Sequence, residues 1–324
     1  MKTIRYIDAI TECLREEMKR DQSVFILGYD VGVRGAIFGL STGLLEEFGA
    51  DRVRDTPISE SAIIGCSIGS AIAGLRPIAF IHFNDFLPVC MDQIVNQAAF
   101  IRYVSGGQVK TPMVIIVAHG GGLSAGPHHS SCHEAWFLNT PGLKIVLPST
   151  PNDAKGLLRS SIRDDNCVLF IGHPLLYGQT GDVTEGEYTI PLGKADVKRE
   201  GNDVSILSFS YMVPVSLAAA NTLQDLGINA EVVDLRTLVP LDRERIVDSV
   251  KKTGRAVIVE EGWKTGGVGA EIMSVVVEGA FDYLDAPIMR IAAKDRPIPF
   301  SPQMEKYILP SKGDIVNAVQ KVVG

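Results

Sequence analysis

The chain has 324 residues, enough for two medium-sized domains that each bury a core. Apolar residues make up 46% of it and charged residues 21%, which is typical of a globular protein rather than a disordered one. The formal net charge of −7 and the lack of a basic stripe argue against nucleic acid as a partner.

Three further properties indicate a cytoplasmic protein. The five cysteines are scattered without a C-x-x-C pair, as is typical of reduced thiols. Residues 1–21 have the pattern of a charged amphipathic helix and lack the apolar region of a signal peptide. No apolar run reaches the ~18–20 residues that a membrane span needs. We therefore expect a cytoplasmic location and no membrane partner.

Short apolar runs alternate with helical stretches in the first half of the chain. Fully apolar runs of this length predict parallel strands that are covered on both faces. The expected helices are 1–21, 61–74, 91–104 and 151–165. The expected strands are 24–28, 76–83, 112–118, 143–149 and 167–172.

The alternation breaks between residues 177 and 202, where Gly, Thr and charged residues predict a linker or hairpin. A second alternating set follows, with expected strands at 204–210, 229–235, 256–261 and 287–293. Its expected helices are 212–227, 241–254, 267–281 and 311–323. The pattern predicts two doubly wound α/β domains with mostly parallel sheets, at 1–185 and 201–324, joined by a linker at 186–200.

Several common site motifs are missing from the chain. There is no phosphate-binding P-loop and no G-x-S-x-G nucleophile elbow. The Gly-rich loops at 119–126 and 262–271 lack the spacing of a dinucleotide fingerprint. A Gly-Asp-Gly with a later Asn-Asn, the motif with which thiamine enzymes hold magnesium and diphosphate, is also missing.

Glu60 stands at the start of an apolar, glycine-studded helical stretch, directly after the turn at 56–59. One interpretation is an ordinary helix start, in which Ser59 caps and Glu60 faces the positive end of the helix dipole, for a gain of roughly 0.3–1 kcal/mol. The other is that this carboxylate contacts a cofactor, and the motifs elsewhere in the chain favour the second interpretation.

Seven stretches carry a resemblance that covers essentially the whole chain. They are DTPISE, MDQIVNQAAFIRYVSGGQVKTP, HSSCHEAW, PGLKIVLPSTPNDAKGLLRSSIRDDN, LLYG, DLRTLVPLD and EEGWKTGGVGAEI. Together they resemble the β subunit of the decarboxylating first component of 2-oxo acid dehydrogenase complexes, shared by the pyruvate, branched-chain and acetoin enzymes. The resemblance implies a pyrimidine-binding domain followed by a transketolase C-terminal-like domain.

The resemblance also implies a thiamine diphosphate site shared between two chains. An α subunit would hold magnesium and the diphosphate, in agreement with the missing Gly-Asp-Gly motif, and the β chain would hold the aminopyrimidine. Glu60 matches the family glutamate that hydrogen-bonds the pyrimidine nitrogen and so activates the thiazolium carbon. Such an acid is most effective when its position is fixed and water is excluded from its surroundings.

Further site residues follow from the same resemblance. Phe86 matches an aromatic that packs on the aminopyrimidine, with a core phenylalanine as the alternative. Ile58 and Tyr29 are expected to contact the cofactor. His129 matches a histidine thought to donate or accept a proton near the thiazolium carbon, with a surface histidine as the alternative.

The family also implies a potassium ion at the end of the helix at 151–165, where free carbonyls and the helix dipole favour a cation. The alternative is an ordinary helix cap. The expected ligands are Met113, Ser161, Ile162, Asp164 and Asn166.

The chain departs from the family pattern at several positions. Tyr29 stands where the family usually has a glutamate of an acidic route between the two cofactor sites, which puts proton communication between them in doubt, although Asp30 remains. Phe80 replaces a second glutamate of the family. Histidines replace other residues at His82, His128 and His173. Because hydroxylated donors are bound by such side chains in transketolase-like enzymes, His82 and His128 are candidates for the substrate pocket.

Three functions remain open at this point. The first is a 2-oxo acid dehydrogenase β subunit that acts with an α subunit as an α2β2 heterotetramer, decarboxylates a 2-oxo acid or cleaves acetoin, and acylates a lipoyl domain. The second is a two-chain transketolase-like enzyme acting on a polar ketose. The third is a non-catalytic assembly subunit, which the presence of Glu60, Phe86 and His129 argues against.

Overall fold

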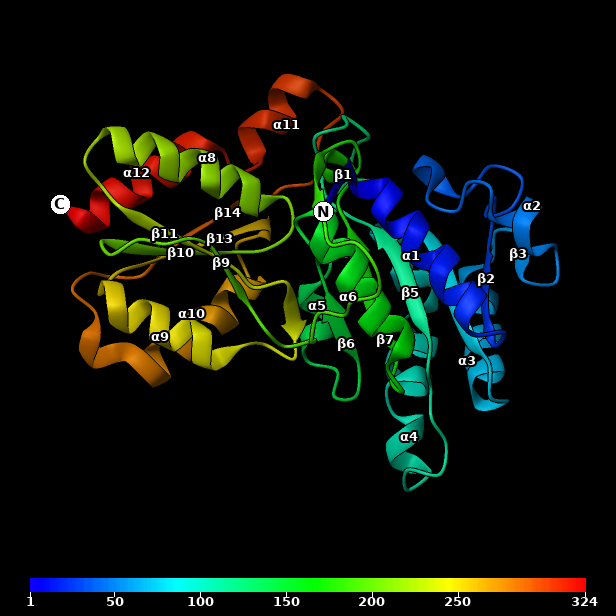
Figure 1. The fold of residues 1–324 in the computed structure, drawn as a ribbon. Coiled ribbons are helices and arrows are strands. Elements are labelled where there is room, and N and C mark those ends of the chain that lie inside the picture. The colour runs from blue at the N-terminus through cyan, green and yellow to red at the C-terminus, as the bar shows by residue number, and fades with distance from the viewer. The chain divides into compact units, whose positions relative to one another are not determined.

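The computed structural model describes residues 1–324, and its chain divides into two compact units (Figure 1). The N-terminal unit comprises 1–119 and 137–192. The C-terminal unit comprises 193–324 together with the segment 120–136. None of the helices has both the length and the apolar character needed to cross a membrane.

A parallel sheet forms the centre of the N-terminal unit. Its strands lie in the order β6-β7-β5-β4-β2-β3. Every residue of β2, β5 and β7 is buried, as the fully apolar runs predict. The strands are β2 (Val24–Gly28), β3 (Val53–Asp55), β4 (Arg76–Phe83), β5 (Val114–Ala118), β6 (Lys144–Val146) and β7 (Val168–Gly172).

Helices and a small second sheet complete this unit. β1 (Lys2–Arg5) pairs with β8 (Thr180–Val183) in an antiparallel sheet. The helix α5 (Ala135–Leu138) spans the point where the chain returns from the C-terminal unit. The other helices are α1 (Tyr6–Arg20), α2 (Leu44–Phe48), α3 (Glu60–Ile72), α4 (Ile101–Val104), α6 (Pro151–Arg163) and α7 (Pro174–Tyr177).

Two helix predictions in this unit were wrong. Residues 2–5 form β1 rather than the first turn of a helix, because their backbone pairs with β8. The stretch 91–104 is not one helix: a π-helical turn at Gln93–Ala98 precedes the short α4. Tertiary contacts explain the break, since the Thr111 hydroxyl bonds the carbonyl of Ala98 and Gly142 packs against that of Ala99.

The C-terminal unit contains a second sheet, in the order β14-β13-β10-β11-β9. All neighbours are parallel except β9, which is antiparallel to β11 and forms inside the predicted linker 186–200. Its strands are β9 (Asp196–Arg199), β10 (Val204–Ser208), β11 (Ala230–Asp234), β13 (Ala256–Trp263) and β14 (Met289–Ala293), and the short β12 (Thr237–Val239) is not part of this sheet. The predicted two-unit α/β fold is confirmed.

Helices cover both faces of this sheet. α8 and α12 lie together on one face, and α9 and α10 lie together on the other (Figure 1). Buried aliphatic side chains of α8, α12 and the strands form its core. The helices are α8 (Met212–Asp225), α9 (Arg243–Thr253), α10 (Val268–Ala280), α11 (Pro302–Ile308) and α12 (Lys312–Val323).

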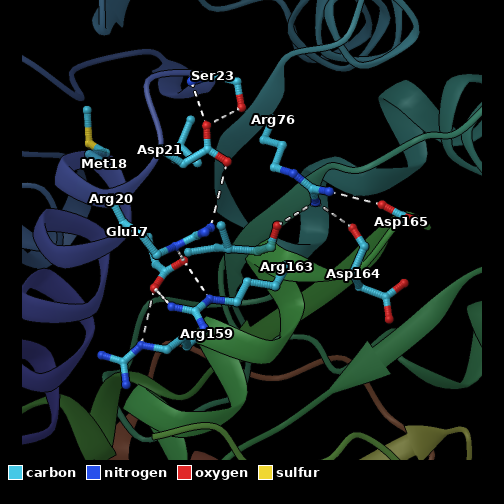
Figure 2. Close-up of polar contacts among 12 residues, drawn as sticks. Glu17, Met18, Arg20, Asp21, Ser23, Arg76, Arg159, Arg163, Asp164 and Asp165 are labelled. Carbon is cyan, nitrogen blue, oxygen red and sulfur yellow. Dashed lines mark hydrogen bonds and ion pairs between the residues drawn. The ribbon is translucent and has the colours of Figure 1, made fainter. Parts of the chain in front are cut away.

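Buried charges join α1 to α6 in the N-terminal unit. The carboxylate of Glu17 lies between the guanidinium groups of Arg20, Arg159 and Arg163 (Figure 2). Glu17 and Arg159 are each only 1% exposed, so neither charge is hydrated. Removing one partner of such a buried pair leaves an uncompensated charge, which costs far more than the loss of a surface ion pair.

We predict that Glu17→Ala lowers the free energy of unfolding by about 3 kcal/mol, because Arg159 loses a buried counter-ion. Urea unfolding followed by circular dichroism measures this loss. Tryptophan fluorescence would report on the other unit, because both tryptophans, Trp136 and Trp263, belong to the C-terminal unit. Asp8→Ala is the matched control on the same helix. Its carboxylate pairs with Arg5, both side chains are exposed, and its loss costs about 1 kcal/mol or less. Equal losses in the two variants would contradict this account.

Candidate functional site

Glu60 lies at the carboxyl edge of the N-terminal sheet, where sites form in open α/β folds. It is the first residue of α3, yet its side chain points inward and is only 8% exposed. Ser59 precedes the helix but makes no side-chain capping hydrogen bond. The segment before it is fixed, because the Thr56 amide donates to the carbonyl of Gly28 at the end of β2. Glu60 is therefore held inside the unit rather than exposed as an ordinary first-turn acid.

Tyr29 and His82 lie beside Glu60. The negative charge of Glu60 and a side-chain hydrogen bond with it both raise the pKa of Tyr29, in addition to the larger effect of burial. The Tyr29 hydroxyl oxygen accepts the backbone N–H of His82 at 3.1 Å. Its own proton is therefore directed to Glu60, and the phenol is neutral at neutral pH.

The His82 ring is part of the same cluster. It packs against the Tyr29 ring, with centroids 3.8 Å apart, and its Nε2 lies 3.0 Å from the Tyr29 carbonyl. Burial lowers the pKa of His82 more than Asp30 and Glu60 raise it, so the neutral imidazole is favoured. Burial and the charge of Glu60 also raise the pKa of the Cys90 thiol to about 12. Glu60 is thus surrounded by groups that are uncharged at neutral pH.

Three of the residues singled out in the sequence are apolar. Ile58 is 75% exposed on the turn before α3. Phe86 is half-buried and packs edge-on against Phe83, with centroids 6.1 Å apart. Phe80, in place of the usual family acid, is 1% exposed and belongs to the core. The acceptor at Glu60 and the apolar groups at Ile58 and Phe86 match the chemistry of an aminopyrimidine, which offers donors at its edge and apolar faces.

His128 and His129 lie in the C-terminal unit, on the loop 120–131. His128 is exposed, and His129 is half-buried, with its backbone N–H bonded to the carbonyl of Gly126. The Gly120 amide donates to the carbonyl of Ser131 and closes the base of the loop.

The substituted histidines differ in their surroundings. His173 is completely buried, accepts the Leu175 amide at the start of α7, and packs edge-on against His119. His82 is engaged by Tyr29, as described above. His173 thus has structural contacts within the N-terminal unit, whereas His82 belongs to the cluster beside Glu60.

The residues expected to bind potassium lie at the end of α6. The carbonyls of Ile162 and Asp164 each accept a hydrogen bond from Arg76 at 3.0 Å (Figure 2). The Asp164 carboxylate pairs with Lys144 and also accepts the backbone and side-chain N–H groups of Asn166. Two cationic side chains, those of Arg76 and Lys144, thus already lie at this helix end, where the negative end of the helix dipole favours positive charge.

The remaining expected ligands complete an all-oxygen set. The carbonyl of Met113 accepts the Val168 amide, and that of Ser161 accepts the Asp164 amide. Each carbonyl has a second lone pair, so these bonds leave acceptor capacity. Oxygen donors suit a hard cation, and the set therefore fits an alkali ion.

Sequence reasoning overlooked two groups that shape these sites. Arg76 reaches the end of α6 across 86 residues of sequence. Glu305 on α11 is 3% exposed and accepts bonds from Gly122 and Ser124 of the histidine loop. The available signal was the spacing of Glu305, Ile308 and Leu309, which places an acid on the apolar face of a helix.

Comparison with known proteins agrees with this architecture. The family model of the transketolase pyrimidine-binding domain matches residues 2–179, and that of the transketolase C-terminal domain matches 193–315. A solved structure, a split-gene transketolase forming an inactive β4 tetramer, superposes with a TM-score of 0.82 at 24% identity, covering 99% of this chain and 98% of that one. At that identity it supports the fold alone.

Characterised relatives share more of the sequence. The 2-oxoisovalerate dehydrogenase subunit beta of Bacillus subtilis is 45% identical, over 99% of both chains. From the same organism, the pyruvate dehydrogenase E1 component subunit beta is 46% identical, over 100% of this chain and 99% of its own. Its acetoin:2,6-dichlorophenolindophenol oxidoreductase subunit beta is 42% identical, over 100% and 98%. The chain therefore belongs to the transketolase-like β subunits of the 2-oxo acid dehydrogenases, a family of thiamine-diphosphate-dependent oxidoreductases.

Proposed function

We propose that this chain, paired with an α subunit as an α2β2 heterotetramer, decarboxylates an aliphatic 2-oxo acid and passes the acyl group to a lipoyl domain. The α subunit would hold magnesium and the diphosphate of the shared thiamine diphosphate. The observation that carries the proposal is the buried Glu60 carboxylate, held on a rigid turn among uncharged groups. Relatives named for pyruvate and for a branched-chain 2-oxo acid support the substrate class, and the relative named for acetoin adds acetoin cleavage as a second candidate reaction.

Glu60 is suited to hold a proton at the ring nitrogen of an aminopyrimidine. Bound thiamine diphosphate supplies the nucleophilic carbon and the electron sink that decarboxylation needs. A carboxylate that is removed from water and fixed by its surroundings polarises a hydrogen-bonded ring more strongly than a hydrated one. Tyr29 directs its hydroxyl proton to Glu60 and limits the orientations of the carboxylate.

The other proposed residues bind or move protons. Ile58 and Phe86 present apolar surface that would cover the faces of the pyrimidine and exclude water. His129 is half-buried on a glycine-rich loop, and an imidazole is well placed to donate or accept a proton near neutral pH. Of the histidines that raised the ketose alternative, His173 is buried at the start of α7, whereas His82 lies beside Glu60 and bonds the Tyr29 carbonyl.

We also propose that the oxygens at the end of α6 hold a potassium ion that stabilises this part of the N-terminal unit. The support is the all-oxygen donor set formed by the five residues named above, at a helix end whose dipole favours positive charge.

We predict that Glu60→Gln reduces turnover of the reconstituted heterotetramer about 100-fold or more, because the amide is a far weaker proton acceptor. The chain is co-expressed with an α subunit and assayed with pyruvate, branched-chain 2-oxo acids, acetoin and phosphorylated ketoses, using thiamine diphosphate and an artificial electron acceptor. Glu244→Gln, an exposed first-turn acid on α9, is the matched control and retains full activity. Turnover of ketoses alone would replace the proposal with the transketolase-like function, and an unaffected Glu60→Gln would remove Glu60 from the mechanism.

For the ion site, we predict that potassium chloride raises the thermal unfolding midpoint of the chain above that in choline chloride at equal ionic strength. An ion at 100 times its Kd stabilises the state that binds it by about 2.7 kcal/mol. Asp164→Ala removes most of the difference between the salts. Asp165→Ala, which removes a neighbouring partner of Arg76 and Lys110, retains it. Identical midpoints in the two salts would show that the helix end is satisfied by its own cationic side chains.

A further inference from the structure

A buried carboxylate of α11 holds the loop that carries His129. Glu305 is 3% exposed and accepts the Gly122 amide at 2.8 Å. It also accepts the amide of Ser124 at 3.1 Å and its hydroxyl at 3.2 Å. All these donors come from the loop, and charge-assisted bonds of this kind are stronger than bonds between neutral groups.

The loop adopts a conformation that needs such support. Ser124 has a φ of 56°, in the left-handed region that non-glycine residues rarely occupy, at a cost of about 1–3 kcal/mol. Both donors of that same residue bind Glu305. The strained residue is thus the one that the carboxylate fixes most completely.

Neighbouring contacts leave the loop little freedom to take another path. Glu261 of β13 accepts the Gly121 amide at 2.7 Å. A Cβ added at Gly121 would meet Leu309 at 2.8 Å, and one at Gly126 would meet the Phe300 ring at 2.3 Å. Residues on both sides of α11 therefore pack directly against the loop, and Glu305 lies between them in the sequence.

We propose that Glu305 is a positioning residue, whose carboxylate fixes the 120–131 loop and thereby sets the place of His129 in the reaction. The relevance for catalysis rests on the role of His129 in the proposed function. Glu305 itself holds a backbone conformation and is assigned no contact with substrate or cofactor. A loop held by one carboxylate and two donor residues has a single well-defined arrangement, which proton transfer by His129 requires.

The proposal is tested in the heterotetramer with Glu305→Ala and the conservative Glu305→Gln. Losing these bonds in Glu305→Ala accelerates amide hydrogen exchange at Gly122 and Ser124 by about 10- to 100-fold. Exchange in β10 and β11 stays unchanged. Glu305→Gln, which keeps an oxygen acceptor, shows a smaller change. In the assay, Glu305→Ala lowers kcat with little effect on KM, and Glu305→Gln recovers most of kcat.

The matched control is Glu231→Ala. Glu231 is a carboxylate of the same unit, 1% exposed and bonded to Ser249 and Lys252 rather than to the loop. The Glu231→Ala substitution lowers the unfolding midpoint but does not accelerate amide exchange in 120–131. This difference separates general destabilisation from a local effect on the loop. If Glu305→Ala does not fold, Ser124→Ala removes one of the bonds to Glu305 and is scored in the same way.

The outcomes distinguish this inference from the proposed function. Unchanged loop exchange in Glu305→Ala would overturn the inference, and so would faster exchange with full activity. If the wild-type heterotetramer turns over no substrate, the proposed function fails, and modification of His129 by diethyl pyrocarbonate provides the readout instead. A several-fold faster modification of His129 in Glu305→Ala then supports positioning by Glu305, and an unchanged rate contradicts it.

Discussion

A carboxylate that is removed from water needs donors or cations at fixed positions, and this constraint shapes both units. In the N-terminal unit, Glu17 is compensated by three arginines and joins α1 to α6. In the C-terminal unit, Glu305 is compensated by backbone and hydroxyl groups of a loop and fixes that loop. The type of donor decides the consequence: paired charges join helices, whereas backbone amides define the path of a segment.

Glu60 has neither the cations that surround Glu17 nor the backbone amide donors that bind Glu305 among its contacts in the N-terminal unit. A phenol, a thiol and a neutral imidazole lie around it, and each remains uncharged at neutral pH. A carboxylate in such surroundings has acceptor capacity that its neighbours do not satisfy, which is a poor arrangement for stability. It is a good arrangement for binding a group that brings its own proton, and this contrast separates a site carboxylate from a structural one.

The sequence predicted the sheets well because their signal is local. Fully apolar runs such as 24–28 and 168–172 are stable when both of their faces are buried, as they are at the centre of a parallel sheet. The break in 91–104 was not predictable, since it depends on Thr111 and Gly142, which lie outside that stretch. The family resemblance made Glu60 and His129 candidates, whereas the bonds between Glu305 and the histidine loop span more than 180 residues and leave no local pattern.

Tyr29 shows how one substitution can keep a site in working order while changing its electrostatics. An acid at this position, as the family usually has, would place a second negative charge close to Glu60, and like charges favour protonation of one of them. Tyr29 instead brings a neutral hydroxyl, anchored by the backbone N–H of His82 and directed to the Glu60 carboxylate. Of the two side chains, Tyr29 and Glu60, only that of Glu60 therefore carries a charge. A route that passes protons between cofactor sites through carboxylates would lack this member, whereas the carboxylate of Asp30 remains beside it in the sequence.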